Sequence, residues 1–226
     1  VATTLTDAAG NAPLVGASTS NYTIDTKEPT VSSVVMSDTA LSVGEASILT
    51  ITFSEAVTGF DNSDITLVNG TLGTISSTDG GVTWTATFTP TDDIEDATNV
   101  ISIAASLTDT AGNVPLTGAN TSNFTIDTIE PVISAVSMSD TMLKVGDTST
   151  LTITFSEAVT GFDNSDIRLD NGTLTTISST DGGVTWTGTF TPTDDVNDAT
   201  NVITVATTLT DTAGNAPLAE ASTSNY

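Results

Sequence analysis

Residues 82–88 read Val-Thr-Trp-Thr-Ala-Thr-Phe, and residues 48–53 read Ile-Leu-Thr-Ile-Thr-Phe. In both stretches apolar side chains alternate with threonine, the two-residue period of a β-strand with one buried face. The same alternation returns at 100–103 (Val-Ile-Ser-Ile) and 124–126 (Phe-Thr-Ile). No stretch combines a sustained helical period with capping residues. The sequence therefore predicts an all-β protein.

The chain repeats itself with a period of 102 residues. One five-residue motif occurs three times at this spacing, as Asp-Ala-Ala-Gly-Asn at 7–11 and as Asp-Thr-Ala-Gly-Asn at 109–113 and 211–215. Residues 26–124 and 128–226 are identical at about three quarters of their positions. Self-similarity at a fixed period is the signature of tandem domains.

This period divides the chain into three units. Residues 26–127 form one repeat, and residues 128–226 form a second that lacks the end of its last strand. Residues 1–25 correspond to the C-terminal strands of a preceding repeat. We therefore expect the sequence to be a window from a longer array.

Each repeat contains seven predicted strands separated by turn signals such as Asn69-Gly70. In the first repeat they lie at about 30–36, 47–54, 64–68, 71–76, 82–89, 99–107 and 122–127. Seven short strands in about 100 residues are typical of an immunoglobulin-like β-sandwich. The fold class expected is therefore tandem immunoglobulin-like sandwiches, arranged end to end, with Trp84 and Trp186 in their cores.

The composition excludes several classes of function. The chain has 28 acidic and 3 basic residues, a formal charge of −25, and no His or Cys. Without His or Cys it cannot build a Cys/His zinc site or a His-based nucleophilic triad. The charge argues against binding nucleic acid, and no apolar run is long enough for insertion into a membrane. Paired acids such as those at 92–96 recur in both repeats, which makes them poor candidates for a glycosidase site, so we expect no enzyme activity.

A second motif, Ser-Thr-Asp-Gly-Gly-Val-Thr-Trp at 77–84 and 179–186, is similar to the Asp-box hairpin of sialidase propellers. A sialidase needs several arginines to hold its substrate, and this chain has Arg168 alone. The motif therefore predicts a tight hairpin whose aspartate, Asp79 in the first repeat, binds the amides of the turn.

Each repeat also carries Phe-Ser-Glu-Ala-Val-Thr-Gly-Phe, Asp-Thr-Ala-Gly-Asn and, at the linker, Ile-Asp-Thr-x-Glu-Pro. Together these motifs resemble the bacterial Ig-like repeats of giant surface adhesins, of the RTX and biofilm type. The resemblance covers the whole chain. It implies an extracellular stalk on the surface of a bacterium, with neighbouring repeats as partners and calcium between domains.

The acids themselves also point to calcium, which is bound by carboxylate, carbonyl and water oxygens. In this sandwich topology the linker, the loop after the second strand and the loop holding Asp-Thr-Ala-Gly-Asn meet at the N-terminal end of each domain. Acids of the preceding domain, at 38, 45, 92, 93 and 96, are expected to approach the same junction. The predicted calcium ligands are Asp25, Glu28, Glu55, Asp109 and Asn113 in the first repeat, and Asp127, Glu130, Glu157, Asp211 and Asn215 in the second.

Two other interpretations of the repeats stay open. Each could be a glycan-binding or protein-binding module, for which an exposed aromatic patch would be expected. Alternatively, copies could pack laterally in an extracellular filament or surface layer. A solvated acidic surface is the corresponding alternative to the calcium sites.

Overall fold

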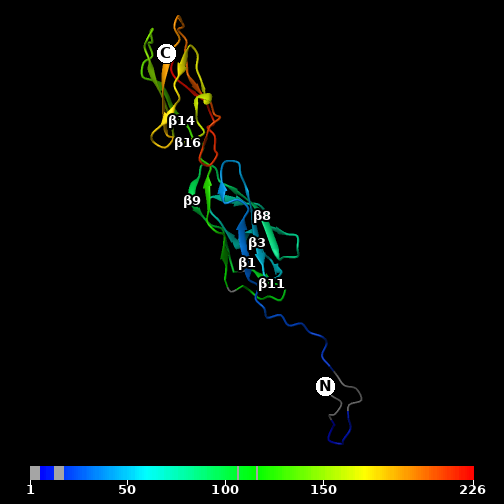
Figure 1. The fold of residues 1–226 in the computed structure, drawn as a ribbon. Helices are drawn as coiled ribbons and strands as arrows, with labels where there is room; N and C mark the ends of the chain where they lie inside the picture. Colours follow the sequence, from blue (N-terminus) through cyan, green and yellow to red (C-terminus); the bar gives the residue numbers. More distant parts are fainter. Residues whose placement is uncertain (1–5, 13–17, 106, 116) are drawn as a thin grey trace.

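The computed structural model describes residues 6–12, 18–105, 107–115 and 117–226. Two β-sandwiches follow one another along the axis of an elongated molecule (Figure 1). The N-terminal segment extends from one end, and the C-terminus lies at the other. Among the described residues no helix has the length and apolar character needed to cross a bilayer.

The first sandwich is built on an antiparallel sheet whose strands run in the order β1-β3-β8-β6, with β7 also paired to β8. Its strands are β1 (Val31–Met36), β3 (Ser47–Phe53), β6 (Gly70–Leu72), β7 (Ser76–Ser77) and β8 (Thr83–Pro90). In β3 buried and more exposed residues alternate along its whole length, as the sequence predicts. This confirms that the alternation of apolar residues and threonine sets the inward face.

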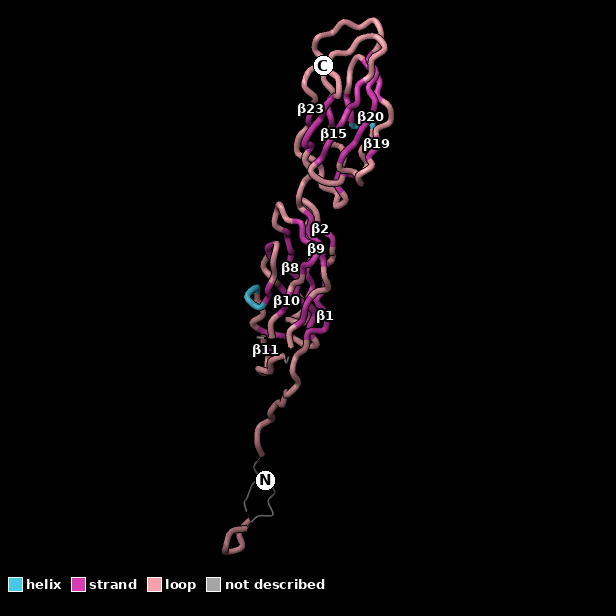
Figure 2. Tube along the Cα trace, turned by 90° about the vertical axis from the view of Figure 1, so that its left-hand side faces the viewer, coloured by secondary structure: helices cyan, strands magenta, loops and turns pink. Residues whose placement is uncertain are grey.

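Three smaller sheets make up the opposite layer, in the orders β12-β10-β5, β2-β13-β9 and β11-β4. Their strands are β2 (Ala40–Leu41), β4 (Val57–Thr58), β5 (Ile65–Thr66), β9 (Glu95–Asn99), β10 (Ser102–Ile103), β11 (Thr108–Asp109), β12 (Ala119–Asn120) and β13 (Phe124–Asp127). Ile51 and Phe88 from the large sheet share one buried cluster with Ile103, Phe124 and Ile126 from this layer. The two layers therefore enclose a single core (Figure 2).

The second sandwich repeats this plan, with the large sheet in the order β14-β15-β20-β18 and β19 paired to β20. Its strands are β14 (Ile133–Met138), β15 (Ser149–Phe155), β16 (Val159–Thr160), β17 (Ile167–Arg168), β18 (Gly172–Leu174), β19 (Ser178–Ser179), β20 (Thr185–Pro192), β21 (Thr204–Val205), β22 (Thr210–Asp211) and β23 (Ala221–Ser222). It has a core cluster of its own, from Ile133 to Leu209. In the part of the chain that the structure describes, helix is confined to the single turns η1 (Asn62–Asp64) and η2 (Asn164–Asp166).

Two details differ from the sequence prediction. The segment Glu95–Asn99, expected in a loop, is strand β9 and pairs antiparallel with β13. The predicted strand at 99–107 is correspondingly reduced to β10. The alternating pattern missed β9 because three of its five residues are acidic or amide side chains, and its one buried residue, Asn99, is polar, so apolar periodicity carries no signal there.

The tryptophans are partly buried, not fully buried as the sequence predicted. Trp84 packs edge-on against Phe60, with ring centroids 5.4 Å apart, and its Nε1 donates a hydrogen bond of 3.0 Å to the carbonyl of Gly81. Trp186 makes the equivalent contact with Phe162 at 5.3 Å. The indole N–H needs a polar partner at the rim, so the ring covers the core edge from outside.

The hairpin between β7 and β8 forms as the Asp-box motif predicts. The Oδ1 of Asp79 accepts hydrogen bonds from the backbone N–H of Val82 and Thr83 and from the hydroxyl of Ser77. These hydrogen bonds, that from the Thr83 N–H first, lower the pKa of Asp79 to about 2. The motif is therefore a turn-stabilising element.

Candidate metal centres

The loop Asp-x-Ala-Gly-Asn is closed by its own aspartate. In the second sandwich the Oδ1 of Asp211 accepts the N–H groups of Ala213, Gly214 and Asn215, and its Oδ2 accepts the amide Nδ2 of Asn215 at 2.8 Å. Asp109 binds Ala111 and Asn113 in the same way in the first sandwich. The carboxylate thus fixes the conformation of the loop through hydrogen bonds within the loop itself, and this needs no bound ligand.

The N-terminal copy of the motif folds identically. Asp7 accepts the N–H groups of Ala9 and Asn11 at 2.9 Å, and its Oδ2 accepts the Nδ2 of Asn11 at 3.0 Å. These residues are exposed, and within the described residues 6–12 and 18–30 there is no strand. The loop geometry is therefore encoded by the five residues alone, and each sandwich receives a carboxylate already held in position.

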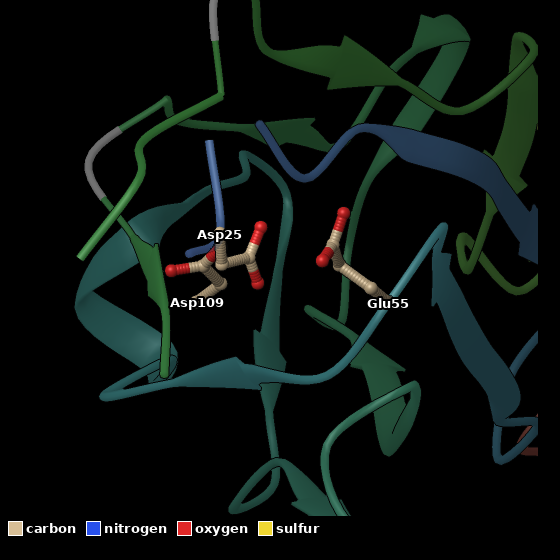
Figure 3. A group of neighbouring side chains, drawn as sticks. All are labelled: Asp25, Glu55 and Asp109. Atoms are coloured by element: carbon tan, nitrogen blue, oxygen red, sulfur yellow. The ribbon is translucent and has the colours of Figure 1, made fainter. Parts of the chain in front are cut away.

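The first acidic cluster consists of Asp25, Glu55 and Asp109. One carboxylate oxygen from each residue lies within 4.8 Å of the others. Asp25 comes from the linker before β1, Glu55 follows β3, and Asp109 ends β11; Asp25 and Asp109 lie close together and Glu55 faces them (Figure 3). Three segments far apart in sequence thus meet at the N-terminal end of the first sandwich.

A lysine ammonium partly neutralises this first cluster. The Nζ of Lys27 lies 3.1 Å from the Oε1 of Glu55. That oxygen is buried, and among the described residues no hydrogen-bond donor is directed at it, so its contact with Lys27 is one of charge, without hydrogen-bonding geometry. Side-chain and backbone hydrogen bonds from Asn113, the side-chain bond first, keep the pKa of Asp109 below its ordinary value.

The second acidic cluster consists of Asp127, Glu157 and Asp211, the equivalents of the first one repeat later. Their oxygens also approach within 4.8 Å, and Asp211 is buried. Position 129, which corresponds to Lys27, is isoleucine. Burial, followed by repulsion from Asp211, raises the pKa of both Asp127 and Glu157 above their ordinary values.

A fourth acid, Glu95, adds to the charge of the second cluster. It stands opposite Asp127 in the pairing of β9 with β13, and its charge contributes to the raised pKa of both Asp127 and Glu157. Glu95 was not among the predicted ligands, and its counterpart in the second repeat is Asn197. The cluster therefore gathers carboxylates from both sandwiches at one junction.

Asn215 joins the two sandwiches directly. Its Nδ2 donates to the linker carbonyls of Asp127 at 3.0 Å and Ile129 at 3.2 Å, and its Oδ1 accepts the N–H of Val43 at 2.8 Å. Val43 lies in the first sandwich, in the loop after β2. A cavity of about 570 Å³ lies beside these contacts, lined by Glu95 and Asp127 from one domain and by Thr212 and Ala213 from the other.

The remaining predicted ligands take other positions. Glu28 and Glu130 lie outside both clusters, and Asn113 and Asn215 turn their amide nitrogens toward the neighbouring aspartate. Three of the five acids expected to approach from the preceding domain accept local backbone hydrogen bonds: Asp38 from Ala40, Glu45 from Ser42 and Asp96 from Thr98. Asp93 lines a cavity at the junction together with linker residues Glu130 and Pro131.

The donor set fits a hard cation. The three carboxylates bring one oxygen each to within 4.8 Å of the others, and water can supply the rest of the six to eight oxygens that calcium takes. Neither cluster contains the nitrogen or sulfur ligands that zinc prefers. Without a cation, like charges about 5 Å apart repel by roughly 1–2 kcal/mol per pair at an effective dielectric constant near 40.

Comparison with known proteins gives one family. Residues 25–126 and residues 127–226 each match the family model of the bacterial Ig-like domain. No curated protein matches the chain at a significant level. Domains of this family are typically modules of extracellular or surface proteins and are typically non-enzymatic.

Proposed function

Because the chain belongs to the bacterial Ig-like domain family, with two tandem copies, we propose that it is a stalk segment of a large secreted or cell-surface adhesin. Its role is mechanical: it holds another part of the protein away from the bacterial surface. The partners of each domain are its neighbours in the chain, and the segment itself catalyses no reaction. The elongated arrangement of the two sandwiches supports this role.

We further propose that calcium stiffens the stalk at the junction between the sandwiches. The observation that carries this step is the origin of the acids at the second cluster. Glu95 and the linker residue Asp127 extend from the first sandwich, and Glu157 and Asp211 belong to the second. A cation held among them has ligands from both sides of the linker, so its binding energy favours the docked arrangement over a bent one.

The backbone of the linker favours the same arrangement. It contains no glycine between Asp127 and Pro131, and Pro131 fixes its own φ and restricts Glu130 to extended conformations. Asn215 adds three hydrogen bonds across the junction. These contacts align the domains, and the repulsion within the acidic cluster opposes them until a cation binds. At a calcium concentration 100 times its dissociation constant, binding adds about 2.7 kcal/mol to the docked state.

The test is a calcium titration by isothermal calorimetry of three proteins. They are the unchanged chain, the variant Asp127→Asn/Glu157→Gln, and the matched variant Asp25→Asn/Glu55→Gln at the first cluster. We expect the unchanged chain to bind calcium with its strongest site at the second cluster. That site is lost in the first variant and kept in the second. Absence of calcium binding by the unchanged chain in millimolar calcium contradicts the calcium proposal.

A further inference from the structure

The junction between the two sandwiches carries a groove, the junction groove, that is separate from the cavity beside Asn215. It has a volume of about 380 Å³ and is lined by Asp93 of the first sandwich, by linker residues and by residues 217–221 of the second sandwich. The junction lies in the middle of the elongated molecule, so the groove is remote from both ends of the chain (Figures 1 and 2). It contains no member of either acidic cluster.

Much of the lining of the junction groove is apolar. Pro131, Ile133 and Pro217 are buried there, whereas Val132 and Leu218 remain 59% and 85% exposed. A single exposed apolar side chain is ordinary on a protein surface, but two that line one cavity offer an incoming apolar group a place from which water is displaced. The groove therefore has apolar surface that the protein itself does not cover.

This apolar character belongs to the second repeat and is absent from the first. About a quarter of all positions differ between the repeats, but half of the groove positions in the linker and the second sandwich do. The groove residues Ile129, Val132, Ile133, Ala219 and Glu220 stand where the first repeat has Lys27, Thr30, Val31, Thr117 and Gly118. Four of these differences make the side chain more apolar or larger, and the fifth adds a carboxylate. The shared fold therefore does not require an apolar groove at this place.

Three carboxylates line the same groove, those of Asp93, Glu130 and Glu220. Glu220 is paired with the guanidinium of Arg168 at 2.5 Å, and the other two basic residues of the chain form ion pairs elsewhere. Within the part of the chain that the structure describes, Asp93 and Glu130 therefore have no basic partner. Any positive charge that balances them comes from outside the chain.

We propose that the junction groove is a docking site for a short basic and amphipathic peptide segment of another protein. An apolar side chain of this segment packs against Val132 and Leu218, and lysine or arginine side chains beside it reach Asp93 and Glu130. Lysine and arginine suit this place because their stems cover apolar surface while their charged ends reach the carboxylates. The volume is near the lower end of the range of ligand sites, so a few side chains fill it.

Two other occupants fit the groove less well. A hydrated metal ion pairs with the carboxylates but gains nothing from the apolar lining, because its ligands are oxygen atoms. A second copy of this chain carries a formal charge of −25, and its three basic residues are already in ion pairs. The combination of apolar surface with unbalanced acids therefore selects a basic partner of different sequence.

The inference goes beyond the proposed stalk and does not depend on calcium. All lining residues except Asp93 belong to the linker or to the second sandwich, so the groove keeps most of its surface whether or not a cation holds the junction. Peptide binding measured with chelator present therefore tests this inference alone. Failure of the calcium proposal would leave it standing, and the reverse also holds.

The test is a titration of the 226-residue protein, in about 0.15 M salt with chelator, with the synthetic peptide acetyl-Lys-Leu-Lys-Leu-Lys-amide. The control peptide, acetyl-Lys-Ser-Lys-Ser-Lys-amide, has the same charge and no apolar side chain. Amide chemical shifts in NMR spectra report both the affinity and the place of binding. We expect the leucine peptide to bind with a dissociation constant below about 1 mM, at least about tenfold more tightly than the serine peptide, and to shift the amides of residues 218–221.

Three variants make the result specific. Leu218→Ser should weaken binding of the leucine peptide about tenfold, and because Leu218 is exposed the change should leave the fold intact. Val132→Thr/Ala219→Thr installs the residues of the first repeat and should weaken binding at least about threefold. Thr150→Ile also installs a residue of the first repeat, at an exposed position of β15 outside the groove, and should have no effect.

Three results would overturn the proposal. The first is the absence of binding by the leucine peptide up to millimolar concentration. The second is equal affinity for the two peptides, which would mean that the acidic surface attracts any cation. The third is an affinity for the leucine peptide that Leu218→Ser leaves unchanged.

Discussion

The two acidic clusters are built on equivalent backbone segments of the two repeats, and they differ in how their negative charge is balanced. Each takes an aspartate from the linker, a glutamate after the second strand of the large sheet and the aspartate of the Asp-x-Ala-Gly-Asn loop. At the first cluster the ammonium of Lys27 lies 3.1 Å from Glu55. At the second, isoleucine replaces the lysine, and Glu95 of the preceding domain adds a further negative charge.

This difference shows that the same local fold can give two kinds of junction. The loop aspartate is positioned by its own five residues in both clusters, so geometry alone does not distinguish them. The linker residue two positions after the linker aspartate, Lys27 in one case and Ile129 in the other, decides whether the chain itself supplies a positive charge to the cluster. Under the calcium proposal, the cluster without a lysine is the one expected to bind calcium more strongly.

The largest effect is expected from removing the asparagine that joins the sandwiches. Asn215→Ala eliminates the side-chain hydrogen bonds to Asp211, which is buried, and to Asp127, Ile129 and Val43, which are partly buried. Each buried group left without a partner costs about 1–3 kcal/mol, so we expect a total loss of roughly 3 kcal/mol in the free energy of unfolding of the second sandwich. Differential scanning calorimetry measures it.

The matched change in the first sandwich is Asn113→Ala. Asn113 binds Asp109 at 2.8 Å and the Asp25 carbonyl at 3.4 Å. We expect Asn113→Ala to lower the free energy of unfolding of the first sandwich by roughly 1 kcal/mol. Equal losses for the two variants would show that the junction contacts of Asn215 contribute nothing, and that both asparagines merely close their loops.

The second effect concerns the linker residue that distinguishes the clusters. Ile129→Lys should place an ammonium beside Glu157 and weaken calcium binding at the second cluster by about tenfold, because the cation must then compete with a resident charge. The reciprocal change, Lys27→Ile, should strengthen binding at the first cluster. Calorimetric titration of both variants measures the two shifts. If both leave the affinities unchanged, the charge-balance comparison is wrong.

A smaller effect is expected at the acid contributed by the preceding domain. Glu95→Gln removes one charge near the second cluster and none near the first, so calcium affinity at the second cluster should fall about threefold to fivefold. Asp92→Asn, in the same region of the chain but outside the cluster, is the control. An equal fall in both variants would point to general charge screening.

The smallest effect is on pH dependence without metal. Burial and Asp211 raise the pKa of Asp127 and Glu157, so the folded junction binds protons before the unfolded chain does, and its stability rises as pH falls from neutral toward the ordinary values of 3.8 and 4.5. Hydrogen bonding lowers the pKa of Asp109, so the first cluster loses stability as pH falls below the ordinary value of 3.8.

Urea unfolding at several pH values, with chelator present, measures this contrast. Asp127→Asn/Glu157→Gln should abolish this rise, because amides do not titrate. A decrease in stability over that interval in the unchanged chain would mean that the second cluster is already neutralised by groups of the protein. The hairpin aspartates Asp79 and Asp181, whose pKa is about 2, lose their contribution progressively as pH falls from the ordinary value of 3.8 toward 2.

Much of the fold could be predicted from the sequence, because alternation and the repeat period are strong signals. The alternation located β3, β8 and β13, and the Asp-x-Ala-Gly-Asn motif located the loop aspartates. The Asp-x-Ala-Gly-Asn motif recurs three times, and this recurrence together with the sandwich topology was enough to predict which residues lie together in each cluster. These elements depend on local chemistry that is written in contiguous residues.

The parts that could not be predicted depend on partners distant in sequence. Glu95 reaches the second cluster through the pairing of β9 with β13, and nothing in its neighbourhood shows that pairing. The bond from Val43 to Asn215 joins residues 172 positions apart. The sequence does distinguish Glu95, because the equivalent residue of the second repeat is Asn197. Without knowledge of the pairing between β9 and β13, however, that difference could not be connected to the acidic cluster.

The most direct test of the central claim is the distance between the two sandwiches with and without calcium. The chain has no cysteine, so Thr71→Cys/Thr173→Cys places one spin label on β6 and one on the equivalent exposed position of β18. Pulsed electron–electron double resonance then measures the distribution of distances. We expect a single narrow peak with calcium and a broad distribution with chelator, and Asp127→Asn/Glu157→Gln should be broad in both. Distributions of equal width with calcium and with chelator would contradict the claim that calcium stiffens the junction.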